Sequence, residues 1–179
     1  MQRGSIIRSL SLNNGHKQMN TGKKFEELFK KSAIEQGFDV TRLKDAGFVG
    51  DKSESRRFTP RNICDFVLFR DGRLFYCELK RREKSLRIDE LTQQKDLVKK
   101  DLSEVNGVDA GYVISMAGDV WWINAGLIEQ LEQDTGKKSF NTRDLINLSL
   151  EHPCFCFGVG LFIPKGKRAQ RINLENLLK

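Results

Sequence analysis

Three charged residues near the middle of the chain are of the types and at the spacing that metal-dependent chemistry uses. Asp65 stands before one apolar run, and Glu78 and Lys80 stand near the end of a second run. Between the runs lies Asp71-Gly72, the strongest short-range signal for a two-residue type I′ hairpin. That turn pairs positions whose numbers sum to 143 (70 + 73), which sets Asp65 directly opposite Glu78. Lys80 then projects from the same face as Glu78, because side chains alternate along a strand.

Two carboxylates that face each other across a hairpin, with Cβ atoms roughly 5 Å apart, repel and need compensation. One interpretation is a solvated sheet edge on which Lys80 serves as the local counterion. The other is a divalent cation between Asp65 and Glu78, whose hard oxygen ligands suit Mg²⁺ or Mn²⁺. The cation is favoured because the neighbouring positions are apolar on both faces, and an unpaired buried charge is costly. These positions are Val67, Phe69, Leu74 and Tyr76 on the carboxylate face, and Cys64, Phe66, Leu68, Phe75 and Leu79 on the other.

Composition limits what such a site could serve. The chain has 179 residues, enough for one domain with a substantial core. Lys and Arg number 31 against 24 Asp and Glu, a net charge of +7, and the pI is near 9.3, which indicates a polyanionic partner. No apolar run is long enough to span a membrane and no signal-peptide core is present, so we expect a soluble, intracellular protein with no membrane partner.

The four cysteines lie within apolar, strand-like runs, so reduced thiols are expected rather than a disulfide framework. The stretch His152-Pro153-Cys154-Phe155-Cys156 resembles half of a zinc site. No second pair of ligands exists elsewhere in the chain, so a zinc site is not favoured.

The first elements of the chain are a basic arm and a helix. Residues 1–19 are polar and basic and are expected to form a mobile arm, followed by one domain over 20–179. A helix is predicted from Asn20 or Thr21 to near Gly37. Glu26 falls at the edge of the buried stripe of this helix, where it could reach a site at the helix–sheet boundary. The stripe consists of Phe25, Leu28, Phe29, Ser32, Ala33 and Gln36.

Basic residues gather on both sides of the central hairpin. After a predicted strand over 38–43, the Gly-, Ser- and Arg-rich stretch 44–61 has the length of a functional or disordered loop. Its bases suit phosphate contacts, although a plain solvated loop is an equal alternative. The candidate DNA-binding residues are Lys52, Arg56, Arg57, Arg61, Arg81 and Arg82.

The remaining elements complete a mixed sheet. A helix is predicted over 87–102, with Gln94 bordering its apolar stripe, and a second hairpin turns at Gly118. Further helices are predicted over 125–133 and 142–149, with a last strand over 155–163. This order of helix, strand, hairpin, helix and strands predicts an α/β fold with a mixed central sheet flanked by helices.

Several of these residues show a resemblance to a known protein family. Asp65 followed by Glu78-Leu79-Lys80 looks like the Asp…Glu-x-Lys core of the PD-(D/E)xK nuclease superfamily, which implies a restriction-endonuclease-like fold. More specifically, residues 20 to about 145 resemble the RecU-type Holliday junction resolvases and their phage relatives. The matching stretches are Asn20-Thr21-Gly22-Lys23-Lys24-Phe25-Glu26, Glu78-Leu79-Lys80, Gln94 and Gly136-Lys137-Lys138-Ser139-Phe140.

Two features depart from that family. It usually has Thr two residues before the first Asp and Tyr directly after it, where this chain has Ile63 and Phe66. The segment that inserts into the junction in the family is short here. We therefore expect this chain to lack a catalytic contribution from those hydroxyl groups. We also expect it to recognise the centre of the junction differently from the family.

The resemblance implies a reaction and a set of site residues. Asp65 and Glu78 would hold Mg²⁺, or Mn²⁺, with the Leu79 carbonyl as a further ligand, to polarise a phosphodiester and activate water. Lys80 would orient the water or offset charge in the transition state. The products would be a 5′-phosphate and a 3′-hydroxyl, made in a bacterial or phage-infected cell near the nucleoid. Glu26 and Gln94 would complete the metal shell or position the water.

Three functions remain open on the sequence. The first is a homodimeric endonuclease that resolves branched, four-way DNA junctions by two symmetric cuts. The second is another nuclease of the same superfamily, of the nicking or restriction type. The third is a DNA-binding module in which the acidic pair is structural. The stretches 20–26 and 136–140 favour the first, and the net charge supports DNA binding in all three.

Overall fold

The protein is described from a computed structural model. It describes residues 21–43, 62–91, 107–162 and 171–179. The expected basic arm, the basic loop over 44–61 and most of the helix predicted over 87–102 lie outside these ranges. No helix in the described ranges is long and apolar enough to cross a membrane.

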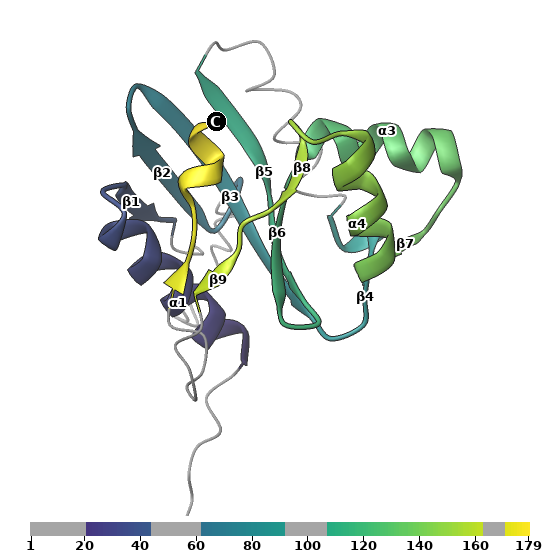
Figure 1. Ribbon diagram of the computed structural model, residues 1–179, viewed down its shortest axis with the longest axis horizontal. Helices are drawn as coiled ribbons and strands as arrows, with labels where there is room; N and C mark the ends of the chain where they lie inside the picture. Colours follow the sequence, from purple (N-terminus) through teal and green to yellow (C-terminus); the bar gives the residue numbers. More distant parts are fainter. Residues whose placement is uncertain (1–20, 44–61, 92–106, 163–170) are drawn as a thin grey trace, which may run out of the picture.

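A six-stranded mixed sheet forms the centre of the molecule, with the strand order β1-β2-β3-β5-β6-β8. The β3–β5 pair is parallel and the other neighbouring pairs are antiparallel. Figure 1 shows the sheet between α1 and the C-terminal segment on one side and α3 and α4 on the other. The predicted α/β class, with a mixed central sheet flanked by helices, is confirmed. The strands are β1 (Asp39–Arg42), β2 (Phe66–Arg70), β3 (Arg73–Arg82), β5 (Val108–Met116), β6 (Asp119–Asn124) and β8 (Cys156–Gly158).

The β2–β3 hairpin has the register that the sequence predicts. Asp71 and Gly72 have φ values of 52° and 77°, the positive values that a type I′ turn requires at both central positions. The pairs run from Arg70 with Arg73 to Phe66 with Cys77, and each pair sums to 143. Gly72 fits this turn without strain because it has no Cβ atom.

One face of the sheet is closed by α1 (Thr21–Glu35) and the C-terminal segment. The predicted helix stripe packs against β2 and β3, with Phe29 and Ala33 fully buried. The last turn leads to Gly37, whose φ is 78°, so the helix ends near the predicted glycine.

A buried polar clasp joins α1 to the short strand β10 (Arg171–Ile172), which pairs with β9 (Leu161–Phe162). Ser32 accepts a hydrogen bond from the Ile172 amide (2.8 Å), and Gln36 accepts one from the Leu174 amide (2.7 Å). The Gln36 amide group also donates to the Ile172 carbonyl (2.7 Å). The clasp satisfies two side chains that would otherwise be costly to bury.

Within the described ranges, a second core cluster covers the other face over β5 and β6, and Tyr76 of β3 packs against its edge. On the hairpin, by contrast, Val67, Leu74 and Tyr76 are only half-buried and Phe69 is 45% exposed. Among the described residues, the apolar positions on this face of the hairpin are thus only partly covered. The helices over this face are α3 (Ala125–Thr135), α4 (Thr142–Glu151) and the 3₁₀ turn η1 (Ile88–Leu91).

Two predicted elements differ locally. Arg87 ends the strand β4 (Ser85–Arg87), which pairs with β7 (Ser139–Asn141), and Ile88 donates to the Lys138 carbonyl (2.9 Å), so the described start of the predicted helix is not α-helical. The last predicted strand is interrupted between β8 and β9. Gly160, with φ of 47°, redirects the chain there from β6 toward β10. A last 3₁₀ turn, η2, spans Glu175–Leu178.

The second hairpin and the two later helices are confirmed. The β5–β6 turn lies at Ala117-Gly118, where both residues have positive φ. Helix α3 begins after Asn124, whose side chain accepts from the Gly126 amide (2.9 Å). Helix α4 begins with a capping box between Asn141 and Asp144.

We expect Gly72→Ala to lower the free energy of unfolding by about 1 kcal/mol, because alanine is strained at the positive φ of this turn. Chemical denaturation measures the change. Gly158→Ala is the matched control, since its φ is ordinary and the added methyl group meets no atom within 4 Å. Equal effects of the two substitutions would contradict the turn assignment.

Candidate active site

Asp65 directly precedes β2, where the regular pairing of β2 with β3 is interrupted. The Asp65 amide donates to the Cys77 carbonyl (3.2 Å), although Cys77 is already the register partner of Phe66. Two residues thus lie against one, a β-bulge, and the predicted pairing of Asp65 directly with Glu78 is not formed. Instead, the Asp65 carboxylate accepts a hydrogen bond from the Leu79 amide (2.8 Å), which places it beside Glu78 along β3.

Glu78 and Lys80 form an ion pair, the contact that the interpretation of Lys80 as a local counterion predicts, but the pair is largely withdrawn from water. The Lys80 Nζ atom lies 2.7 Å from Glu78 Oε1, and the two side chains are only 18% and 9% exposed. Their parallel partners on β5 are Tyr112 and Ile114, which belong to the core under α3 and α4. An ion pair so withdrawn from water interacts more strongly than one on the surface, and it fixes the position of both side chains.

The Cys64 thiol lies within the field of both carboxylates. Burial, together with the negative charges of Glu78 and Asp65, raises the pKa of this thiol to about 12. The thiol donates to the Phe66 carbonyl across the bulge (3.2 Å). Asp65 and Glu78 therefore converge on the same end of the hairpin.

Glu26 approaches this end of the hairpin from the opposite face of the sheet. It lies on α1, whereas Glu78 and Lys80 project from the other face, and its carboxylate pairs with Arg42 of β1 (2.5 Å). Arg42 is the register partner of Phe66, which directly follows Asp65. The structure thus places Glu26 at the predicted helix–sheet boundary, engaged by a cation that the sequence analysis did not single out.

Gln94 lies outside the described residues, but the chain leading to it is anchored beside Glu78. The Tyr112 hydroxyl donates to the Leu91 carbonyl (3.2 Å). Tyr112 is the β5 partner of Glu78, and Leu91 is fully buried. Sequence analysis missed Tyr112, whose only signal was a tyrosine in an apolar strand.

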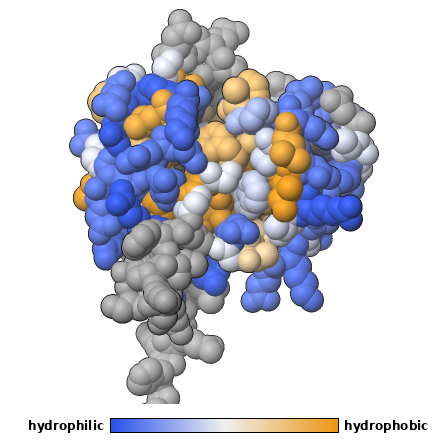
Figure 2. Space-filling model, viewed as in Figure 1, coloured by the Kyte–Doolittle hydropathy of each residue, from blue (hydrophilic) through white to orange (hydrophobic). Residues whose placement is uncertain are grey.

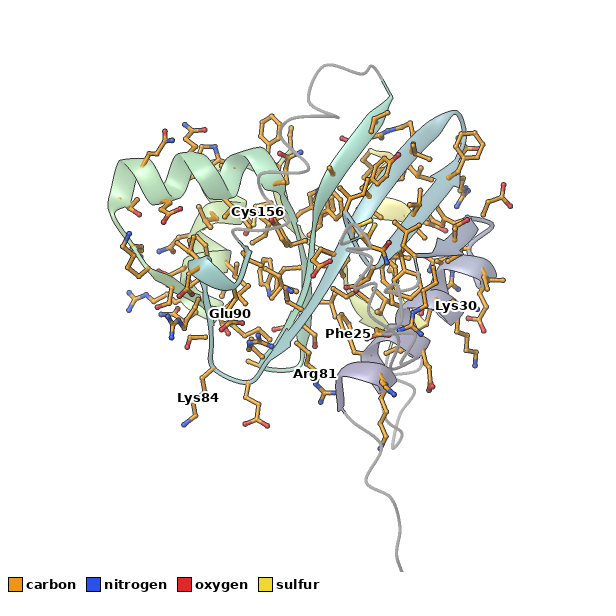
Figure 3. All side chains as sticks on the ribbon, turned by 180° about the vertical axis from the view of Figure 1, so that it is seen from behind. Phe25, Lys30, Arg81, Lys84, Glu90 and Cys156 are labelled. Carbon is orange, nitrogen blue, oxygen red and sulfur yellow. The ribbon has the colours of Figure 1, made fainter. Side chains whose placement is uncertain are left out.

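Of the predicted DNA-binding residues, Arg81 and Arg82 are described. Arg81 is exposed, and Figure 3 shows it at the end of β3, between the labelled Phe25 of α1 and Glu90 of η1. Arg82 pairs with Glu90 and donates to the Arg81 carbonyl. The other four lie beyond the part of the chain that the structure covers: Lys52, Arg56, Arg57 and Arg61.

The donor set fits a hard divalent cation. Within the described ranges, no three His, Cys, Asp or Glu side chains gather where they could hold a metal ion. Two carboxylates do converge, and Mg²⁺ is commonly bound by one or two carboxylates, with water and substrate phosphate in its other positions. All four cysteines are free thiols in the structure.

Comparison with known proteins gives a distant likeness among solved structures. No protein-family model and no curated protein matches the chain. Among solved structures, the chain is similar to Hjc from Archaeoglobus fulgidus, a Holliday junction resolvase from an archaeal hyperthermophile. The two chains are 18% identical with a TM-score of 0.46, over 69% of this chain and 90% of the other. What the site does is therefore inferred from its own residues.

We expect one of the four thiols to react in the folded protein. Cys154 is exposed, whereas Cys64, Cys77 and Cys156 are buried. Burial raises the pKa of both Cys64 and Cys156 to about 12, and it raises that of Cys77 well above its usual value. Titration with a chromogenic disulfide near neutral pH should release one equivalent in buffer and four in denaturant. More than one fast equivalent in buffer would contradict the burial of the other three thiols.

Proposed function

We propose that the protein is a metal-dependent endonuclease that resolves four-way DNA junctions by paired, symmetric hydrolysis of phosphodiester bonds. The observation that supports this most directly is the hydrogen bond between the Asp65 carboxylate and the Leu79 amide, next to the buried Glu78–Lys80 pair. Asp65, Glu78 and Lys80 are the Asp…Glu-x-Lys set of the resemblance.

Asp65 and Glu78 would hold Mg²⁺ or Mn²⁺, with the Leu79 carbonyl as a further ligand. When bound, such an ion polarises the phosphodiester and lowers the pKa of a water molecule beside it. The Leu79 amide keeps Asp65 turned toward β3, so its carboxylate is positioned before DNA arrives. Such preorganisation is what an electrostatic site requires.

Lys80 contributes a positive charge at a fixed place. Its ammonium group is held by Glu78 at 2.7 Å and is largely shielded from water. It can donate a hydrogen bond to the attacking water or to the phosphate oxygen on which charge develops. Glu26, paired with Arg42, would act from the α1 side as a positioning residue rather than as a first ligand.

The choice of a four-way junction rests on the resolvase-like stretches 20–26 and 136–140, whereas the net charge supports DNA binding of any kind. The stretch 136–140 leads into β7, which pairs with β4, the strand that follows β3 in the chain. Gly136 ends α3 in the left-handed region, and the Lys138 carbonyl holds Ile88 at the start of η1. A net charge of +7 suits the phosphate backbone of DNA. Two symmetric cuts need two copies of the site, hence a homodimer.

The first test is cleavage of a labelled four-way junction beside a linear duplex of the same arms, with Mg²⁺ or with EDTA. We expect symmetric cuts in the junction alone, lost in EDTA. Asp65→Asn and Glu78→Gln should each slow cutting by at least about a hundredfold, because each removes a charged oxygen ligand. Asp119→Asn, an exposed carboxylate at the start of β6, is the matched control.

Other outcomes of that test separate the alternatives. Equal cutting of junction and duplex would indicate a nicking or restriction-type nuclease instead of a resolvase. Binding of the junction by the wild type with no cutting under any metal would indicate a DNA-binding module in which the acidic pair is structural.

A second test compares Arg81 with Arg82 in DNA binding. Arg81 is exposed at the strand end, whereas Arg82 is half-buried, so a phosphate group reaches the Arg81 side chain more easily. We expect Arg81→Ala to reduce the slope of log affinity against log salt by about one, and Arg82→Ala to reduce it less. Unchanged slopes in both variants would remove this end of β3 from the DNA interface.

A further inference from the structure

Helix α4 exposes apolar side chains on the face turned away from the core. Ile146 is 45% exposed and Leu150, one turn later, is 77% exposed, while Leu145 and Leu148 are buried on the opposite side. Phe155, just after the helix, is 51% exposed. We call Ile146, Leu150 and Phe155 the α4 stripe, and Figure 2 shows a hydrophobic band over α4.

This stripe differs from the other exposed apolar residues. Ile34 on α1 and Phe69 on β2 are exposed to a similar degree, but each lies on a different element. Single exposed apolar side chains are ordinary on protein surfaces, whereas neighbouring ones indicate a contact surface.

The charges at the two ends of α4 are complementary. Arg143 in the first turn and Glu151 at the last residue are both exposed. Neither has an ion pair within the described part of the chain. Asp144, in the same first turn, does form an ion pair, with Lys137 (2.5 Å). The helix therefore presents a positive charge at its start and a negative charge at its end, separated by the two apolar residues.

We propose that the α4 stripe is the contact between two copies of this chain. In an antiparallel pairing of the two helices about a two-fold axis, Ile146 meets Leu150 of the partner subunit, and the reverse contact follows by symmetry. Arg143 then approaches Glu151 of the partner subunit at each end of the contact. The two helix dipoles also oppose each other, which favours this direction of pairing.

The size of the contact indicates which residues must take part. A stable interface buries about 800 Å² on each partner, more than one face of a ten-residue helix supplies. The adjoining turn over 152–155 extends the surface with Phe155, an aromatic side chain of the kind that dominates binding energy at interfaces. Asn124 donates to the Phe155 carbonyl (2.7 Å), which ties this turn to the sheet.

This inference rests on the proposed function for the reason that a dimer is needed, because two symmetric cuts need two copies of the site. The contact itself involves neither Asp65 nor Glu78, so it can be tested without measuring cleavage. The measurement is the mass of the full-length protein by sedimentation equilibrium over a range of concentrations. We expect a monomer–dimer equilibrium whose dissociation constant rises at least about tenfold in Leu150→Glu.

Two controls make the mass measurement specific. Ile34→Glu places the same charge at a similarly exposed apolar site on α1 and should leave the dissociation constant unchanged. Arg143→Glu and Glu151→Arg should each weaken the dimer, and together they should restore it, because the pairs form again with exchanged charges.

The outcomes separate this proposal from the proposed function. A wild type that stays monomeric throughout, or a dimer that Leu150→Glu leaves intact, overturns the α4 contact whatever the cleavage result. A dimer that depends on Leu150 supports it even if junctions are not cut, and in that case only the proposed function fails. If both hold, monomeric Leu150→Glu should nick one strand of a junction without the paired second cut.

Discussion

The hydrogen bond from the Leu79 amide to the Asp65 carboxylate is the contact on which the candidate site depends. A regular hairpin would oppose Asp65 to Glu78, two like charges that repel. The bulge at Asp65 moves its backbone onto Cys77 and turns its carboxylate to an amide donor on β3 instead. Glu78 is in turn neutralised by Lys80. The hairpin can therefore hold two carboxylates at one end without an unpaired charge in the sheet.

The two faces of the sheet differ in the residues that pack against them. The α1 face is closed by large aromatic residues and fastened by Ser32 and Gln36 to the C-terminal segment, so the back of the hairpin is rigid. On the opposite face, the described residues pack over β5 and β6 and against Tyr76 of β3, and Phe69 on the hairpin is 45% exposed. Glu78 and Lys80 lie beside this packed part, because their partners on β5, Tyr112 and Ile114, belong to its core.

Local chemistry explains which features the sequence predicts. Asp71-Gly72 sets a two-residue turn, and that turn alone determines the register of β2 and β3; the stripe of α1 follows equally from helical periodicity. The bulge at Asp65 has no sequence signal, because it depends on the bond to Leu79, and a regular continuation of the ladder is the simpler prediction. The clasp of Gln36 to Ile172 joins residues 136 positions apart, which no local pattern shows. Incomplete cover of an apolar face is likewise decided by the packing of distant elements, not by the strand's own residues.

The central claim is that Asp65 and Glu78 hold a divalent cation. The most direct test is binding of Mn²⁺ to the DNA-free protein, followed by the loss of the free-ion electron paramagnetic resonance signal, in the wild type, Asp65→Asn and Glu78→Gln. The account predicts that the wild type binds Mn²⁺, that Mg²⁺ displaces it, and that each variant binds at least about tenfold more weakly. Equal binding by all three proteins, or none by the wild type at millimolar Mn²⁺, would contradict it.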